Sequence, residues 1–203
     1  MTRLFLVRHG ETNWNLEKRF GGRSDEARLT EKGKEQVRLL RKRLATEHID
    51  ALYCSPLTRA LDTAKIIKPD GVEIQIHPDL IERDFGDVDG MKSQEYRDAH
   101  PELYDGNGGY YLNDLPGVKG LELFADVRKR GLRVLKEIAE KETGTVLIVT
   151  HGTLLRAIFT SLMGTDSTDR KSLPGNCSLS ILNYEAGKFT VELFNDLSHE
   201  VTA

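Results

Sequence analysis

The sequence of 203 residues lacks the features that mark secreted and membrane proteins. Its two cysteines, Cys54 and Cys177, lie far apart and form no Cys-x-x-Cys pair, so we expect buried, reduced thiols and no disulfide. No run reaches the roughly 18 apolar residues of a membrane span, and the apolar run after Arg3 is too short for a signal peptide. By elimination, these absences predict a cytoplasmic protein that makes no contact with a membrane.

The sequence also lacks an excess of charge of either sign. Its 29 lysines and arginines stand against 32 aspartates and glutamates, for a net charge of −3. This balance argues against a nucleic-acid partner, because no general basic surface is available, and any functional arginine must act locally. No His-x-x-x-His or His-Glu-x-x-His spacing occurs, so neither a metal nor a cofactor is expected.

Three short apolar runs each lead directly into polar residues. They are residues 4–7, 51–54 and 146–149, followed by Arg8-His9-Gly10, by Ser55-Pro56-Leu57-Thr58-Arg59 and by Thr150-His151-Gly152. Such runs predict buried strands, and parallel strands bring their carboxyl ends to one edge of a sheet, where α/β folds bind ligands. Two histidines and two arginines would then meet there. Because imidazole can attack phosphorus and guanidinium groups bind phosphate oxygens, the pattern predicts a phosphate-handling site.

The remaining apolar spacing predicts one α/β domain over residues 1–203, built as a three-layer αβα sandwich with a largely parallel central sheet flanked by helices. Helices are expected over 30–44, 121–141 and 151–162, and a further helix is expected to start at Ser55-Pro56 with the serine as its cap. Residues 73–76, 178–184 and 189–194 read as strands, the last two paired. That pair could serve either the core or a homodimer.

The segment of about 92–120 has a long irregular part, which is rich in glycine and carries the pair Tyr110-Tyr111. Loops of this length without regular structure are usually functional or disordered. Because this one carries aromatic side chains, we expect it to act as a lid over a substrate.

The chemistry of the predicted site centres on His9. A neutral imidazole attacks phosphorus if one ring nitrogen is free and the other is held as N–H by an acceptor. Arg8 and Arg59 can each donate two parallel hydrogen bonds to phosphate, and Gly10 is expected to let the backbone approach it. His151 is either a second phosphate ligand or, together with His9, a metal ligand; a metal would need a third ligand and would be repelled by Arg8.

The reaction also needs a proton donor for the leaving alcohol. Glu82 and Asp84 are rival carboxylates in one apolar segment, and the residues alone leave both open. Asn15 is a further neutral donor that could complete the shell of groups around the phosphate oxygens.

Arg8-His9-Gly10-Glu11-Thr12 with Asn15 resembles the signature of the histidine phosphatase superfamily, in its phosphoglycerate-mutase-like branch, and the broad-specificity phosphatases within it. Further matches follow in the family's order almost to the last residue. They are Leu29–Gly33, Ser55–Ala60, Thr63-Ala64, Glu82, Phe85-Gly86, Gly90, Glu122, Val149–Gly152, Asn176, Asn195-Asp196 and His199.

This resemblance implies that His9 becomes a phosphohistidine, with Arg8, Arg59 and His151 around the phosphoryl group. It also implies that Glu82, in preference to Asp84, protonates the leaving group and then activates water, with no metal or other cofactor. The substrate-binding residues expected on this basis are Arg8, Gly10, Asn15, Gly21, Gly22, Arg59, Glu82 and Gly152.

Three functions remain to be separated. Residues 101–120 offer only Lys119 as a basic residue, whereas related mutases carry paired arginines in a longer insertion. This favours a phosphatase that hydrolyses small phosphomonoesters with a smaller or less charged leaving group. A cofactor-dependent phosphoglycerate mutase is the alternative, and a non-catalytic module that binds a phosphorylated ligand is the third. The expected partner in every case is a small phosphorylated metabolite.

Overall fold

Six strands form one sheet in the computed structural model, which describes residues 1–103, 113–165 and 172–200. In chain order they are β1 (Thr2–Arg8), β2 (Ala51–Cys54), β3 (Ile74–Ile76), β4 (Gly144–Thr150), β5 (Leu179–Glu185) and β6 (Lys188–Asp196). Across the sheet the order is β3-β2-β4-β1-β5-β6. The first four strands are parallel, and β5 runs antiparallel to its neighbours β1 and β6. The largely parallel sheet predicted from the sequence is therefore confirmed.

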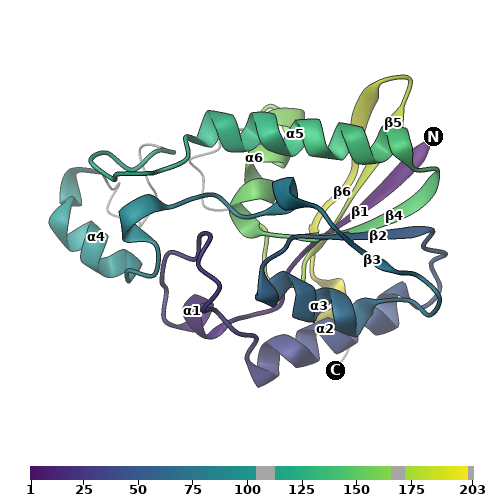
Figure 1. Cartoon of the computed structure of the whole chain (residues 1–203), viewed down its shortest axis with the longest axis horizontal. Helices are drawn as coiled ribbons and strands as arrows, with labels where there is room; N and C mark the ends of the chain where they lie inside the picture. Colours follow the sequence, from purple (N-terminus) through teal and green to yellow (C-terminus); the bar gives the residue numbers. More distant parts are fainter. Residues whose placement is uncertain (104–112, 166–171, 201–203) are drawn as a thin grey trace.

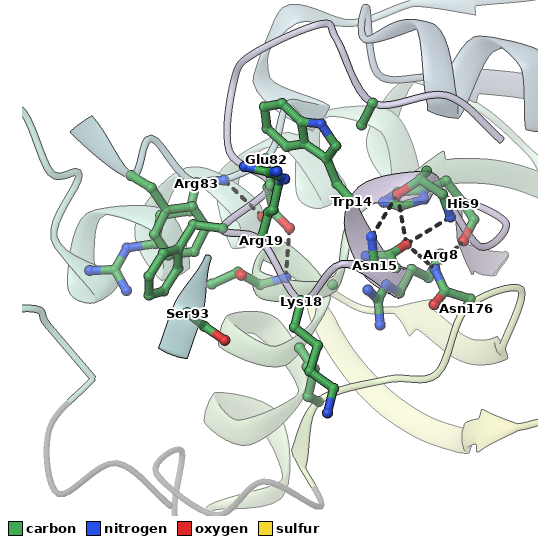
Figure 2. Close-up of a pocket in the computed structure, with 18 of the residues that line it drawn as sticks. Arg8, His9, Trp14, Asn15, Lys18, Arg19, Glu82, Arg83, Ser93 and Asn176 are labelled. Carbon is green, nitrogen blue, oxygen red and sulfur yellow. Dashed lines mark hydrogen bonds between the residues drawn. The ribbon is translucent and has the colours of Figure 1, made fainter. Parts of the chain in front are cut away.

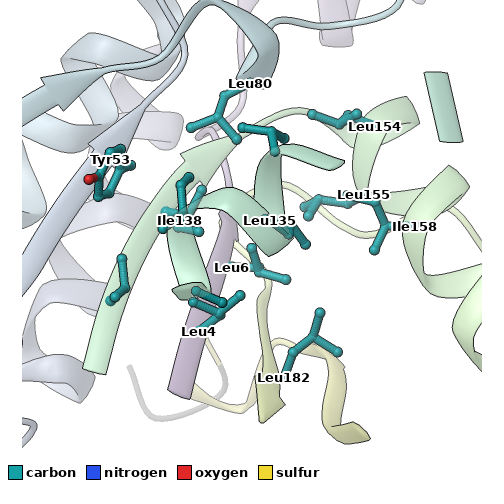
Figure 3. Packing of buried hydrophobic residues seen from close by; sticks show 14 of the residues in the cluster. Leu4, Leu6, Tyr53, Leu80, Leu135, Ile138, Leu154, Leu155, Ile158 and Leu182 are labelled. Atoms are coloured by element: carbon teal, nitrogen blue, oxygen red, sulfur yellow. The ribbon is translucent and has the colours of Figure 1, made fainter. Parts of the chain in front are cut away.

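Helices cover both faces of this sheet (Figure 1). On one face lie α5 (Phe124–Lys141) and α6 (Gly152–Met163), and on the other α2 (Glu31–Leu44) and α3 (Thr58–Ile67). The side chains of β1 alternate between the two layers, as strand geometry requires. Leu4 and Leu6 pack with α5 and α6 (Figure 3), whereas Phe5 and Val7 pack with α2 and α3. Burial on both faces explains why the strands read as continuous apolar runs.

Of the two predicted helix starts, at Thr30 and at Ser55, the structure confirms the first and not the second. The hydroxyl of Thr30 caps α2 by accepting a hydrogen bond from the Gly33 amide at 2.9 Å, as expected for a helix over 30–44. Helix α3, in contrast, begins at Thr58, after Leu57, which makes no side-chain cap. The assignment of Ser55 as the helix cap was wrong: its hydroxyl accepts from the Leu57 amide at 3.4 Å, ahead of the helix, and is also hydrogen-bonded to His151.

Two short helices were not predicted. Helix α1 (Asn13–Leu16) is closed by a capping box in which Thr12 and Asn15 satisfy each other's backbone amides. Helix α4 (Ser93–Ala99) opens the segment that the sequence marks as a lid. Tyr110 and Tyr111 lie outside the described residues, so the lid stays a prediction.

Two expectations from the composition concerned the cysteines and membrane-spanning segments. Cys54 and Cys177 are both free and buried, as predicted. Burial raises the pKa of the Cys54 thiol to about 12 and also raises that of Cys177, which makes both thiols poor nucleophiles. Across the part of the chain that the structure describes, no helix is long and apolar enough to cross a membrane.

Candidate active site

The carboxyl ends of β1, β4 and β2 coincide, which brings the predicted site residues together. The parallel register pairs Arg8 with Thr150 and Cys54 with Val149. One residue further along, the His9 amide donates a hydrogen bond to the Thr150 carbonyl at 3.0 Å. The rings of His9 and His151 consequently lie edge to face, with 5.2 Å between their centroids.

A cavity of about 380 Å³ opens at this edge (Figure 2), within the size range usual for small-molecule sites. Most of the predicted site residues line it: Arg8, His9, Asn15, Gly21, Arg59, Glu82 and Gly152. His151, Gly10 and Gly22 are not among its lining residues. His151 has no exposed surface and lies against His9.

The contacts of His9 define which ring nitrogen is free. Its Nδ1 lies 2.8 Å from the carbonyl oxygen of Gly10. Because a carbonyl can only accept, Nδ1 carries the hydrogen and Nε2 keeps its lone pair. Burial, with the charges of Arg59 and Arg8, holds the pKa of His9 well below its ordinary value. His9 is therefore a neutral imidazole with one nitrogen free to attack.

His151 is held by a residue that the sequence did not assign to the site. Its Nε2 lies 2.6 Å from the Ser55 hydroxyl. Its Nδ1 is buried and has no hydrogen-bond partner within the described residues. Burial, followed by the charges of Arg59 and the neighbouring His9 and Arg8, lowers its pKa well below the ordinary value. Because the ring does not line the cavity, its role as a phosphate ligand stays a prediction.

These two histidines make the stability of the fold depend on pH. An unfolded histidine takes up its proton near pH 6.5, whereas folded His9 and His151 stay neutral to lower pH. Below pH 6.5 the unfolded state binds more protons, so the free energy of unfolding falls as the pH falls towards the folded-state pKa values. Each histidine contributes about 1.4 kcal/mol per pH unit to that slope.

Urea unfolding at pH 7, 6 and 5, in buffers without phosphate, measures this slope. The variant His9→Ala removes one of the two shifted groups, so its slope should be shallower, by up to about 1.4 kcal/mol per pH unit. Equal slopes for the parent and the variant would show that the folded state does not lower the pKa of His9.

The two arginines of the site are fixed by backbone carbonyls. Arg59, only 2% exposed, donates from Nη2 to the Gly22 carbonyl at 2.7 Å and from Nη1 to the Ser24 carbonyl at 3.1 Å. Arg8 donates from Nη1 to the Pro174 carbonyl at 2.6 Å. Carbonyls orient a guanidinium group without neutralising it, so both charges remain available to a phosphate.

The site glycines serve different purposes from one another. A Cβ on Gly152 would lie 3.0 Å from Nε of Arg8, so the absence of a side chain lets Arg8 lie across the start of α6. A Cβ on Gly10 would lie 2.8 Å from the Gly33 carbonyl oxygen, and the Gly10 amide donates to Thr63. Gly10 thus allows close packing against α2, and because it does not line the cavity, the approach of its backbone to a phosphate stays a prediction.

Gly21 and Gly22 contribute mainly through their backbone. Gly21 lines the cavity, whereas Gly22 accepts from Arg59 and donates its amide to Asp89 at 2.7 Å. Asn15 uses its Oδ1 to accept from Thr12 and from Asn176, at 3.0 Å in the latter case. This orientation presents the Nδ2 group of Asn15 as a donor, the role expected of it from the sequence.

Glu82 and Asp84 occupy different surroundings. Glu82 is 5% exposed and lines the cavity, with its carboxylate accepting from the amides of Arg83, Thr153 and Leu154 at 2.8–3.1 Å. It therefore occupies part of the N-terminus of α6. Asp84 does not line the cavity and pairs with Arg23 at 3.5 Å. The geometry favours Glu82 as the carboxyl that can reach a substrate.

The outer part of the cavity carries basic residues that the sequence analysis missed. Its lining includes Lys18, Arg19, Arg83 and Arg156, together with Asn113. Arg83 pairs with Asp114 and Arg19 with Glu17, whereas Arg156 donates to the neutral amide oxygen of Asn113 at 2.8 Å. Helical spacing was the available signal for Arg156, because it lies one turn after Gly152 in α6.

The described residues of this site do not resemble a metal-binding site. Within the described residues, no group of three or more His, Cys, Asp and Glu side chains could hold one. Beside His9 and His151 lie instead two guanidinium groups, which repel a cation.

Comparison with known proteins identifies the family. A family model described as the histidine phosphatase superfamily (branch 1) matches residues 4–197. The chain belongs to this superfamily. A metal-independent phosphoserine phosphatase from Arabidopsis thaliana is 34% identical, over 98% of this chain and 83% of its own. Phosphoglycerate mutase-like protein 4 from the same plant is 32% identical, over 97% of this chain and 86% of its own.

A solved structure extends the comparison to three dimensions. Phosphoserine phosphatase from Entamoeba histolytica, in complex with 3-phosphoglyceric acid, is 27% identical and superposes with a TM-score of 0.82. The match covers 98% of this chain and 99% of that one. The predicted superfamily, the flanked α/β sheet and the phosphatase class of enzyme are confirmed by these relationships.

Proposed function

We propose that this histidine phosphatase hydrolyses small phosphomonoesters in two steps through a phosphohistidine on His9. In the first step Nε2 attacks phosphorus, the bond to the alcohol oxygen breaks, and Glu82 gives that oxygen a proton. In the second step Glu82 takes a proton from a water molecule that attacks the phosphohistidine, which releases phosphate and restores neutral His9. Arg8 and Arg59 stabilise the charge on the phosphoryl oxygens in both steps.

One observation carries this proposal. His9, whose Nε2 is left free, lines a single cavity together with Glu82, Arg8 and Arg59. A nucleophile, a proton donor and charge-stabilising groups around one hollow are the parts that phosphoryl transfer needs. His151, in ring contact with His9, completes the proposed set.

The basic lining of the outer cavity favours a leaving group that carries a carboxylate. Besides Arg8 and Arg59 the cavity is lined by four more basic residues, and among the described lining residues Glu82 is the one carboxylate. The expectation of a less charged leaving group considered only the basic residues of 101–120, whereas these cations come from α6 and from the segments around residues 18 and 83. We propose phosphoserine, the substrate named for two of the relatives, as the first candidate.

A substrate panel assayed with a chelator tests the proposal. We expect phosphate release from phosphoserine to continue in EDTA, with kcat/KM at least about tenfold above that for glycerol 2-phosphate, which lacks the carboxylate. Equal rates on the two substrates would show that the carboxylate of the leaving group is not recognised. Loss of activity in EDTA that returns with added metal would contradict the metal-independent mechanism.

The same panel separates the alternatives. The relative named phosphoglycerate mutase-like keeps a mutase reaction in view. If isomerisation of 3-phosphoglycerate, followed by phosphorus NMR, is faster than phosphate release, the chain is a mutase. A protein that binds these esters but never carries labelled phosphate on His9 would be a binding module. A cytoplasmic location and a homodimer are further parts of the proposal, and a sedimentation experiment tests the second.

A further inference from the structure

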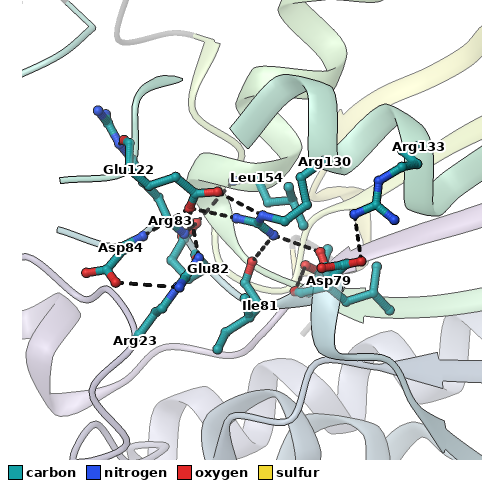
Figure 4. A network of polar contacts seen from close by, with 12 residues as sticks. Arg23, Asp79, Ile81, Glu82, Arg83, Asp84, Glu122, Arg130, Arg133 and Leu154 are labelled. Atoms are coloured by element: carbon teal, nitrogen blue, oxygen red, sulfur yellow. Dashed lines mark hydrogen bonds and ion pairs between the residues drawn. The ribbon is translucent and has the colours of Figure 1, made fainter. Parts of the chain in front are cut away.

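An ion pair that does not line the cavity holds the loop that carries Glu82 (Figure 4). Glu122 lies just before α5 and Arg130 lies within it. Nε and Nη2 of Arg130 donate to the two carboxylate oxygens of Glu122, each at 2.9 Å. The two side chains are only 11% and 15% exposed, so this bidentate pair is well shielded from solvent.

The pair is bonded to the main chain on both sides of Glu82. Nη1 of Arg130 donates to the carbonyls of Asp79 and Ile81 at 2.7 and 2.8 Å. On the other side, the Glu122 carboxylate accepts from the Asp84 amide at 3.2 Å, and the Glu122 amide donates to the Asp84 carbonyl at 3.0 Å. The backbone of residues 79–84 is thereby tied to the start of α5.

The side chain of Glu82 is oriented from a second direction. Its carboxylate is bonded to backbone amides at the start of α6 and to the amide of Arg83. Arg83 in turn donates from Nε to the Glu122 carbonyl at 2.8 Å. Burial acts to raise the pKa of Glu122, but the hydrogen bonds and charge of Arg130 outweigh it and keep the pKa below the usual range. The pair therefore remains ionised at neutral pH.

We propose that Arg130 and Glu122 are positioning residues for Glu82, and that their pair sets the distance between its carboxyl group and the leaving oxygen. Neither lines the cavity, so both act through the loop of residues 79–84. This inference rests on the proposed role of Glu82 as proton donor. Because proton transfer needs hydrogen-bond distance, a shift of about 1 Å in that loop is enough to slow it severely.

Substrates whose leaving groups differ in acidity distinguish misplacement of Glu82 from a loss of the whole active site. The serine alkoxide is a poor leaving group and needs a proton from Glu82, whereas p-nitrophenolate leaves without one. The value of kcat/KM reports the first chemical step, in which the leaving group departs. Misplacement of Glu82 therefore lowers kcat/KM for phosphoserine and spares that for p-nitrophenyl phosphate.

The variants are Arg130→Lys, which keeps the positive charge near His151 but loses the guanidinium fork, and the milder Glu122→Gln. We expect each to lower kcat/KM for phosphoserine about 10- to 100-fold and that for p-nitrophenyl phosphate by less than about threefold. The matched control is Arg133→Lys. Arg133 is on the same helix and pairs with Asp79, but through an exposed side chain. It should leave the ratio of the two values unchanged.

Two further measurements make the outcomes distinct. If Arg130 acts through Glu82, adding Arg130→Lys to Glu82→Gln should leave the ratio where Glu82→Gln alone puts it. Equal losses on both substrates, or no loss on either, would overturn the positioning role. If Glu82→Gln itself changes both substrates equally, the proposed role of Glu82 has failed. Thermal melting of each variant shows whether the fold is retained, and Glu122→Gln serves if Arg130→Lys does not fold.

Discussion

Replacing His9 with alanine should lower kcat/KM for phosphoserine by at least about 10⁴-fold, because His9 is the one imidazole among the described residues that line the cavity. His9 lines the cavity and has a free Nε2, whereas His151 is fully buried and is hydrogen-bonded to Ser55. Phosphate release measures the loss. Rapid quenching with labelled substrate should show phosphate on the parent protein and none on the variant.

His48→Ala is the control for that experiment. His48 lies in an exposed position, paired with Asp50, and its removal should change neither rate nor labelling. A His9→Ala protein that hydrolyses as fast as the parent would end the assignment of the nucleophile. Labelling of His9 without release of phosphate would instead point to a transfer reaction.

Exchanging Arg59 for lysine should lower kcat/KM by about 10²- to 10³-fold and also destabilise the fold by about 1–3 kcal/mol. Lysine keeps the charge but cannot reproduce the planar fork that reaches both a phosphate and the backbone. The carbonyls of Gly22 and Ser24 would each lose the hydrogen bond that they accept from the buried Arg59 guanidinium. Steady-state kinetics measures the first effect and urea unfolding measures the second.

Arg38→Lys provides the comparison for this variant. Arg38 is an exposed residue of α2 that pairs with Glu35. Its exchange should leave kcat/KM unchanged and the free energy of unfolding within about 0.5 kcal/mol of the parent value. A loss of stability in Arg59→Lys with full activity would show that Arg59 only supports the fold. A loss of activity alone would show that its contacts to carbonyls contribute little.

Much of the fold and the inner part of the site could be predicted because both depend on local patterns. Residues 4–7 and 146–149 read as buried strands, and parallel pairing then placed His9 and His151 at one edge of the sheet. The choice of Glu82 over Asp84 came only from family resemblance, since both are carboxylates of one short loop. Their surroundings differ through contacts to α6 that no local pattern reveals.

The parts that could not be predicted involve residues far apart in the sequence. Ser55 looked like a helix cap, because a serine before a proline is typical of one, yet its partner His151 lies 96 positions away. Gly10 looked like a phosphate contact, whereas the structure shows it packed against Gly33. The bonds from Arg130 to the loop of Glu82 span about 50 positions and depend on how α5 crosses that loop.

The central place of β1 in the sheet has a consequence for how the protein is made. Its neighbours β4 and β5 are formed by residues 144–150 and 179–185, which are synthesised much later. A ribosome adds about 5–20 residues per second, so the apolar side chains of β1 wait on the order of 10–40 s for both partners. The growing chain therefore exposes the apolar, unpaired strand β1 until nearly the whole chain has emerged from the ribosome. We expect chaperones to bind this strand during that interval.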